Sequence, residues 1–157
     1  MPTIAQLQAE INGMVKERIQ ERVADSKNFM DVNVAARHMD RDATKRLKLN
    51  EDNPGIGLEH DEGDHRVMGG YYKNSFNKPS VYGLVGYTPL HINDNLKMGV
   101  VGGGVTGYIK PVTPAAGLIG TYQNGDTGVN LTLVPTVKVG DTKAYGFAGV
   151  QLRHRFK

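Results

Sequence analysis

Residues 80–122 read SVYGLVGYTPLHINDNLKMGVVGGGVTGYIKPVTPAAGLIGTY. Apolar residues alternate there with small or polar ones in short runs, and segments rich in Pro, Asn and Asp separate the runs. A period of two that is bounded by turn-forming residues predicts antiparallel strands joined by turns. After residue 54 no helical pattern of useful length interrupts the series.

The same pattern continues on both sides of this stretch and predicts eight strands. They are expected at 30–38, 54–60, 65–73, 80–88, 95–108, 115–122, 127–135 and 144–156. Eight antiparallel strands in meander order form a closed barrel or a sandwich. Nineteen of the 20 glycines follow residue 54, and strands that bend around a narrow interior favour glycine. We therefore expect a mainly β fold: an eight-stranded antiparallel up-and-down β-barrel preceded by an N-terminal amphipathic α-helix.

The connections between these strands differ in length at the two ends of the barrel. Short ones at 61–64, 89–94 and 123–126 share one end, and longer ones at 39–53, 74–79, 109–114 and 136–143 share the other. This asymmetry is typical of outer-membrane barrels. The mean hydropathy of −0.40, the absence of Trp, and the charged Arg37, Glu59 and Arg66 within strands argue against a lipid-facing surface. The choice between a lipid-facing and a water-facing barrel stays open at this point.

Residues 1–27 form a separate segment with helical periodicity. Its apolar positions lie three or four residues apart and are Ile4, Leu7, Ile11, Met14, Val15, Ile19 and Val23. The chain thus divides into a docking or attachment helix at 1–27 and a barrel at 28–157 with a long polar connection at 39–53. The helix can pack on its own barrel, associate with another copy or attach to a larger protein assembly. A membrane-surface helix is less favoured, because the apolar face carries no aromatic residue.

Several function classes find no support in the composition. The chain has no cysteine, and its net charge of +3 comes without a basic run, which argues against nucleic acid as a partner. The His, Asp and Glu residues at 60–65 read as a solvated polar turn, so no metal is expected. The glycine-rich run at 99–104 lacks the following helix and the Lys-Ser/Thr of a phosphate-binding loop, so nucleotide binding is not expected. The N-terminus is charged and amphipathic, so no secretory signal is expected.

Five short strings occur in a fixed order along the chain. They are GIGL at 55–58, YKNSFNK at 72–78, YIKP at 108–111, LVP at 133–135 and the terminal Arg155-Phe156. Together with a short helix and eight strands, they resemble the outer-membrane lipid A palmitoyltransferase family. The likeness covers most of the chain, and the segment at 73–78 is its most specific element.

The resemblance implies a tilted membrane barrel whose apolar interior holds a phospholipid acyl chain. It implies that prolines matched by Pro111 and Pro135 interrupt strand pairing and open lateral access for lipid. It also implies acyl transfer from phospholipid to lipid A by His38 and Ser75, with an Asp where this chain has Asn74. The strand order by itself places these three residues at the end with the longer connections. Asparagine can orient a histidine but cannot offset its charge, so a loss of rate is expected.

Two functions follow as hypotheses. The first is a non-enzymatic structural or attachment barrel that docks into an oligomeric assembly through its helix, in a bacteriophage virion or an envelope-interacting assembly. Asn74, the missing Trp and the missing secretory signal favour it, and Asn74-Ser75 then form an ordinary turn. The alternative is an outer-membrane acyltransferase that moves a palmitoyl chain to lipid A, or a lipid-binding barrel, with lipid or lipopolysaccharide as partner. Neither needs a cofactor.

Overall fold

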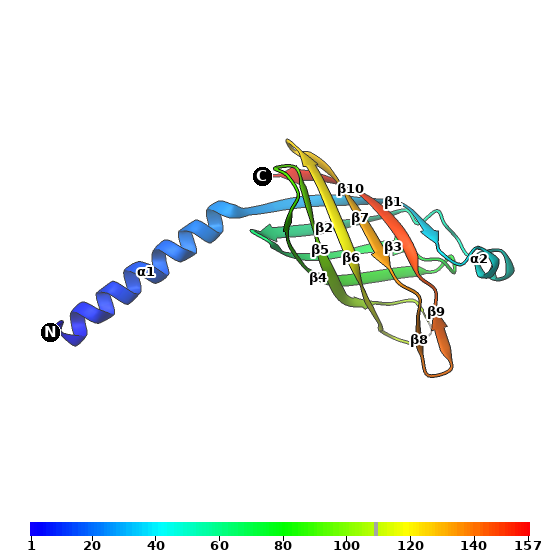
Figure 1. Ribbon diagram of the computed structural model, residues 1–157, viewed down its shortest axis with the longest axis horizontal. Helices are drawn as coiled ribbons and strands as arrows, with labels where there is room; N and C mark the ends of the chain where they lie inside the picture. Colours follow the sequence, from blue (N-terminus) through cyan, green and yellow to red (C-terminus); the bar gives the residue numbers. More distant parts are fainter. Residues whose placement is uncertain (109) are drawn as a thin grey trace.

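The structure is a computed structural model that describes residues 1–108 and 110–157. The described residues form two helices and ten strands (Figure 1). In chain order these are α1 (Ile4–Asp25), β1 (Ser26–His38), α2 (Arg41–Leu47), β2 (Gly55–Glu62), β3 (His65–Lys73), β4 (Pro79–His91), β5 (Leu96–Val105), β6 (Thr113–Asn124), β7 (Thr127–Val134), β8 (Val137–Val139), β9 (Thr142–Ala144) and β10 (Phe147–Phe156).

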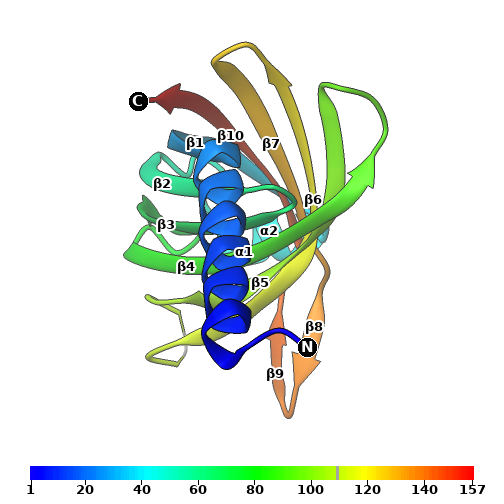
Figure 2. The ribbon, with the colours of Figure 1, turned by 90° about the vertical axis from the view of Figure 1, so that its left-hand side faces the viewer.

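Eight of these strands close into an antiparallel barrel, which Figure 2 shows from the end that carries α1. The order around it is β1-β10-β7-β6-β5-β4-β3-β2, and β2 pairs with β1 to complete the circle. The predicted fold class is confirmed. The tight connections at 63–64, 92–95 and 125–126 lie at the α1 end, here called the turn rim. The connections at 39–54, 74–78, 106–112 and 135–146 lie at the opposite end, here called the loop rim.

The strands at the loop rim differ from the prediction in one respect. β8 and β9 form a separate hairpin, so the strand expected at 144–156 begins only at Phe147. Gly140 has a φ of 61° at the tip of this hairpin, a conformation that suits a two-residue turn between short alternating strands. α2 forms within the polar connection, where the Asp40 side chain caps it by accepting a hydrogen bond from the Ala43 backbone N–H at 2.8 Å.

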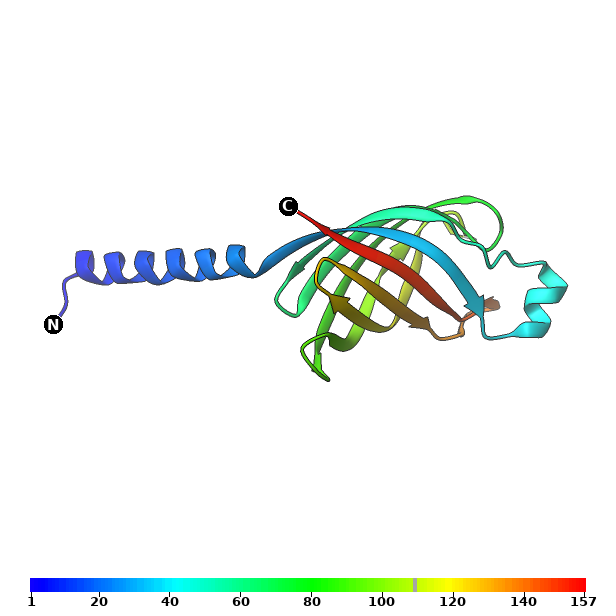
Figure 3. The ribbon, with the colours of Figure 1, turned by 90° about the horizontal axis from the view of Figure 1, so that it is seen from above.

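α1 extends away from the turn rim and does not pack along the barrel wall (Figures 1 and 3). Thr3 and Gln6 form a capping box at its start, and β1 follows its last residue directly at Ser26, four residues before the predicted strand. In this fully described segment no residue is buried, and its ion pair to the barrel joins Arg22 Nε and Glu62 Oε1 at 3.4 Å. No helix in the described residues combines the length and apolarity needed to cross a membrane.

The outward face of the barrel carries a continuous apolar band. Exposed large apolar side chains on it are Met30, Val32, Ile56, Leu58, Val67, Val81, Val85, Val100, Leu118, Leu131 and Leu152. Along β6 the band runs from Pro114 to Tyr122, a rise of about 27 Å along the strand. At a tilt of about 40° this gives a height of about 20 Å, near that of a lipid-facing band. Among the described strand residues, charged outward side chains begin at the edges, as with Arg37 at the loop rim.

Aromatic residues lie at both edges of this band. Tyr87, Tyr122 and Phe156 are exposed near the turn rim, and Tyr71 is exposed near the loop rim. Membrane barrels place aromatic side chains at both interfaces in this way. The absence of Trp argued against a lipid-facing surface, but Tyr and Phe occupy the edge positions here.

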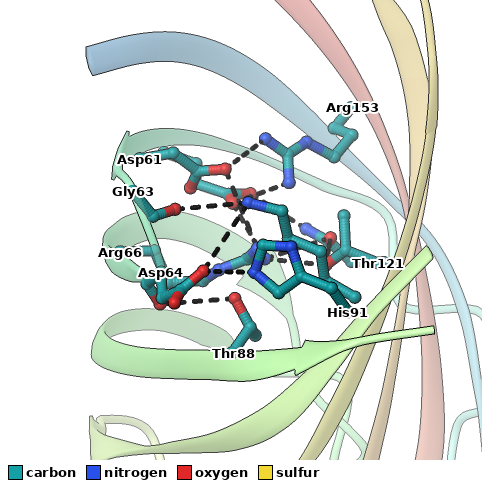
Figure 4. A network of polar contacts seen from close by, with 11 residues as sticks. Asp61, Gly63, Asp64, Arg66, Thr88, His91, Thr121 and Arg153 are labelled. Carbon is teal, nitrogen blue, oxygen red and sulfur yellow. Dashed lines mark hydrogen bonds and ion pairs between the residues drawn. The ribbon is translucent and has the colours of Figure 1, made fainter. Parts of the chain in front are cut away.

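The barrel interior changes from apolar to ionic along its axis. Met68, Tyr82, Val101 and Ile119 form an apolar cluster at mid-height. Toward the turn rim, Arg153 Nη1 lies 3.0 Å from Glu59 Oε1 and Arg153 Nη2 lies 2.8 Å from Asp61 Oδ2. Arg66 Nη1 lies 3.0 Å from the same Glu59 oxygen. Figure 4 shows Arg153, Asp61 and Arg66 of this network. The charged strand residues Glu59 and Arg66, which the sequence pattern left unexplained, therefore face inward and pair there.

Candidate functional site

His38 and Ser75 meet at the loop rim. His38 is the last residue of β1, and Ser75 lies 37 residues later in the connection between β3 and β4. The imidazole Nε2 lies 2.9 Å from the serine Oγ, and both residues are buried. The structure thus brings together two residues that the resemblance paired. An imidazole at this distance can take the proton of a serine hydroxyl as that oxygen attacks an acyl carbon.

Asn74, the third residue implied by the resemblance, is fully buried, and its side chain binds its own loop, the start of β4 and the connection after β5. Its Nδ2 donates to Ser80 Oγ at 2.9 Å and to the Gly107 carbonyl at 2.8 Å. Its Oδ1 accepts from the backbone N–H groups of Phe76 at 2.9 Å and Lys78 at 3.0 Å. The two bonds accepted by Oδ1 fit the turn interpretation of Asn74. They also fix the loop that presents Ser75.

A carboxylate on the other side of the imidazole was missed from the sequence. Glu51 Oε1 lies 3.7 Å from His38 Nδ1, accepts from the His38 backbone N–H at 3.0 Å, and pairs with Arg41 Nη1 at 2.5 Å. Glu51 belongs to the connection at 39–53, whose sequence predicts a solvated loop or a short helix. Its only sequence signal is its place at the same rim as His38, because no fixed spacing links a loop glutamate to a strand-end histidine.

The charges around the imidazole act in opposite directions. Burial lowers the pKa of His38, while the nearby Glu51 carboxylate raises it and the Arg41 guanidinium lowers it. Partial burial works to raise the pKa of Glu51, but hydrogen bonds from the His38 backbone N–H and the Arg41 guanidinium outweigh it and hold that pKa below its usual range. Glu51 is therefore ionised at neutral pH and faces the ring.

An apolar cavity of about 110 Å³ opens below this pair into the barrel. One water-sized probe occupies about 10–15 Å³, so the space is several times larger than a single buried water needs. Ser75 lies on its wall near the loop rim, and Tyr72 Oη contacts Tyr108 Oη at 2.9 Å beside it. Other lining residues include Ala36, Met68, Leu84, Val101, Val105, Val134 and Phe147. The cavity can hold hydrocarbon next to the serine hydroxyl.

Two strand pairs part near the loop rim. β1 pairs with β2 only as far as Asn33, and β6 pairs with β7 only from Leu118 onward. Among the described residues, 34–38 of β1 and 113–117 of β6 have no ladder partner on those sides. Pro135 directly follows the end of β7 and Pro111 precedes β6, both at this rim. Lipid access through these breaks stays a prediction; Ile109, within the string at 108–111, lies outside the described residues.

The polar residues at 60–65 and the glycine run at 99–104 make contacts within the barrel wall. His60 Nδ1 lies 2.7 Å from Asn28 Oδ1, and in the described part of the chain no three metal-ligating side chains come together. A Cβ on Gly103 would lie 2.1 Å from the Gly83 carbonyl oxygen. The glycine run therefore allows β4 and β5 to approach closely.

Comparisons with known proteins add the following findings. No family model matches the chain, and no curated protein matches it. Among solved structures, the outer membrane protein Ail of Yersinia pestis, determined in a phospholipid bilayer nanodisc, is similar at 14% sequence identity and a TM-score of 0.42. The match covers 83% of this chain and 99% of that chain. No activity follows from a likeness of that size.

Proposed function

We propose that the protein is a membrane-embedded barrel that transfers a fatty acyl chain from a phospholipid to a hydroxyl group of lipid A. The observation that carries this proposal is the 2.9 Å contact between His38 Nε2 and Ser75 Oγ on the edge of an apolar cavity. A buried serine–histidine pair suits acyl transfer, and an apolar cavity beside it suits a lipid chain.

The outward surface supports the membrane location. An apolar band about 20 Å tall with aromatic residues at its edges suits contact with lipid, whereas the ionic side chains are paired inside the barrel. His38 and Ser75 lie beyond the band at the loop rim, at the level where Arg37 is exposed. That level suits a bilayer interface, where the ester groups of phospholipids lie. We propose the bacterial outer membrane as the bilayer.

The chemistry follows from the pair. Ser75 Oγ attacks the ester carbonyl, and its proton passes to His38 Nε2. The bond between the acyl carbon and the glycerol oxygen then breaks, and His38 returns the proton to that oxygen, which leaves as a lysophospholipid. A hydroxyl of lipid A next attacks the acyl-serine while His38 takes its proton. The serine oxygen leaves and recovers the proton, so the acyl chain has moved and the protein is unchanged.

The charge distribution supports a phosphorylated acceptor. The loop-rim segments 37–52, 73–79, 106–112 and 135–146 carry ten Lys/Arg and five Asp/Glu. The turn-rim segments 26–28, 62–65, 91–97, 124–127 and 154–157 carry four of each. The net positive charge of the barrel ends therefore lies at the loop rim, the end that carries Ser75. Basic clusters at a membrane surface attract anionic lipid headgroups.

Acyl transfer in defined vesicles tests the proposal. The full chain is folded into vesicles that contain lipid A and a phospholipid with a radiolabelled acyl chain, and label in lipid A is followed with time. We expect transfer by the wild type and a loss of at least about 100-fold in Ser75→Ala and His38→Gln. Ser26→Ala, a serine at the opposite end, is the matched control and should transfer normally. Equal rates in the wild type and Ser75→Ala would reject the assignment.

A second candidate rests on α1. All seven apolar positions of this helix are at least 44% exposed, and the helix extends away from the barrel. Such a surface suits docking into a protein assembly, as an attachment barrel requires. Location in a bacteriophage virion stays a prediction of this second candidate.

Mass measurement of the full chain separates the two candidates. If the helix associates with other copies, the wild-type particle should have a mass greater than that of one chain. The double variant Ile11→Glu with Met14→Glu should then have the mass of a single chain. Gln8→Glu with Gln20→Glu, on polar positions of the same helix, is the control. A wild type that remains a single chain and transfers acyl chains supports the enzyme instead.

A further inference from the structure

We propose that Glu51 is the positioning residue of the His38–Ser75 pair and supplies the carboxylate that position 74 lacks. This inference deepens the proposed function and rests on it for its activity measurement. Its electrostatic part can be measured without any reaction.

The proton arrangement of the imidazole calls for an acceptor on the Glu51 side. If Nε2 is to accept the proton of Ser75, neutral His38 must carry its own proton on Nδ1. Nδ1 is buried and has no hydrogen-bond partner among the described residues, and Glu51 Oε1 faces it at 3.7 Å. Catalytic hydrogen bonds are often longer in the free enzyme than in the reacting complex. A movement of less than about 1 Å would make this approach a hydrogen bond.

The backbone around Glu51 ties together both halves of the site. The Glu51 carbonyl accepts from the Ala36 N–H at 3.0 Å, in the part of β1 that has left β2. The N–H of the preceding Asn50 donates to the Ser75 carbonyl at 2.7 Å. One short segment thus anchors the strand end that carries the imidazole and the loop that carries the hydroxyl. Glu51 is held next to His38 by the same bonds that position Ser75.

Arg41 opposes Glu51 and offers an independent check. Its guanidinium pairs with the same Oε1 that faces the imidazole, and it disfavours a positive charge on His38. Glu51 and Arg41 are the charged groups that face the ring in the described structure. Removing the Glu51 charge should therefore lower the pKa of His38, and removing the Arg41 charge should raise it. A role for Glu51 in loop folding alone predicts no such opposition.

Titration of the imidazole by NMR tests the electrostatic part. The full chain, labelled with ¹³C at His Cε1, is folded in detergent micelles, and the His38 signal is assigned by its loss in His38→Gln. Glu51→Gln keeps an oxygen that can accept from the His38 N–H but removes the charge. We expect its His38 midpoint to fall by about 0.5–1 pH unit and that of Arg41→Gln to rise. Glu62→Gln and Arg46→Gln, which remove charges elsewhere, should leave it unchanged.

Activity supplies the second measurement. Glu51→Gln should lower kcat about 10–100-fold with KM within about twofold, and Glu51→Asp should recover part of the rate. An unchanged His38 midpoint in folded Glu51→Gln overturns the inference. If Glu51→Gln does not fold, Glu51→Asp decides, because it moves the carboxylate away from the ring: a lowered His38 midpoint supports the inference and an unchanged one overturns it. If Glu51→Gln and Arg41→Gln shift the His38 midpoint in opposite directions but the wild type transfers no acyl chain, the Glu51–His38 pairing is supported and only the proposed function fails.

Discussion

The guanidinium carbon of Arg153 lies 3.4 Å from the centroid of the Phe29 ring, inside the barrel and beside the ion pairs with Glu59 and Asp61. Arg153 belongs to β10, the last strand, and Phe29 belongs to β1, the first. The arginine thus joins three strands, β10, β1 and β2, where the two ends of the sheet meet. Contacts between side chains far apart in the sequence therefore stabilise the closed barrel.

Arg153→Met should destabilise the barrel strongly. Removing Arg153 leaves the carboxylates of Glu59 and Asp61 with Arg66 as the remaining guanidinium of this buried network, and we expect a loss of about 3–5 kcal/mol in the free energy of unfolding. Because the chain has no Trp, urea unfolding is best followed by far-UV circular dichroism. Arg155→Met removes a partly exposed rim charge that pairs with Asp126 and should cost less than about 1 kcal/mol. Equal losses in the two variants would contradict a structural role for the buried network.

Asn74→Asp should destabilise the protein without raising acyl transfer. Asn74 Nδ2 donates to Ser80 and to the Gly107 carbonyl, and a carboxylate oxygen at that position faces the carbonyl with no proton to donate. Leaving these buried groups unsatisfied costs about 1–3 kcal/mol. Unfolding by urea measures the loss, and the vesicle assay measures the rate. Faster transfer in this variant would show that the Asp implied by the resemblance acts from position 74 here as well.

The glycines of the sheet should differ sharply in what they tolerate. A Cβ on Gly103 would lie 2.1 Å from the Gly83 carbonyl oxygen, so Gly103→Ala forces β4 and β5 apart and should cost about 1–3 kcal/mol. A Cβ on Gly120 meets nothing within 4 Å, and Gly120→Ala should be neutral or stabilise by up to about 1 kcal/mol. Urea unfolding of both variants measures the difference. Similar values would mean that strand approach does not explain the glycine run.

The fold was predictable from the sequence because alternation and turn chemistry are local properties. Eight strands, their order and the two kinds of rim follow from runs of about ten residues and the segments between them. The inward pairing of Glu59 and Arg66 with Arg153 was not predictable, since Arg153 lies on the last strand and comes next to Glu59 only when the barrel has closed. A charge inside a strand therefore looked like an argument against a membrane barrel.

The site was only partly predictable, for a related reason. His38 and Ser75 could be placed at one rim from strand order, and a resemblance paired them. Glu51 could not be found, because its approach to the imidazole depends on backbone bonds from Ala36 and Asn50 within an irregular connection. The hairpin of β8 and β9 was missed because two three-residue strands are too short for a periodic signal.

The outward apolar band should tolerate arginine differently at mid-height and near its edge. Leu118 is 55% exposed at the middle of β6, and Leu90 is 61% exposed near the turn rim. For a barrel that spans a bilayer, an outward arginine at mid-height costs about 2–4 kcal/mol, whereas one near an interface costs about 0–1 kcal/mol. Leu118→Arg should therefore lower the unfolding free energy in phospholipid vesicles much more than Leu90→Arg, measured by denaturant titration with circular dichroism. Water on the outer face would make both substitutions nearly neutral, so equal and small effects would contradict a lipid-facing band.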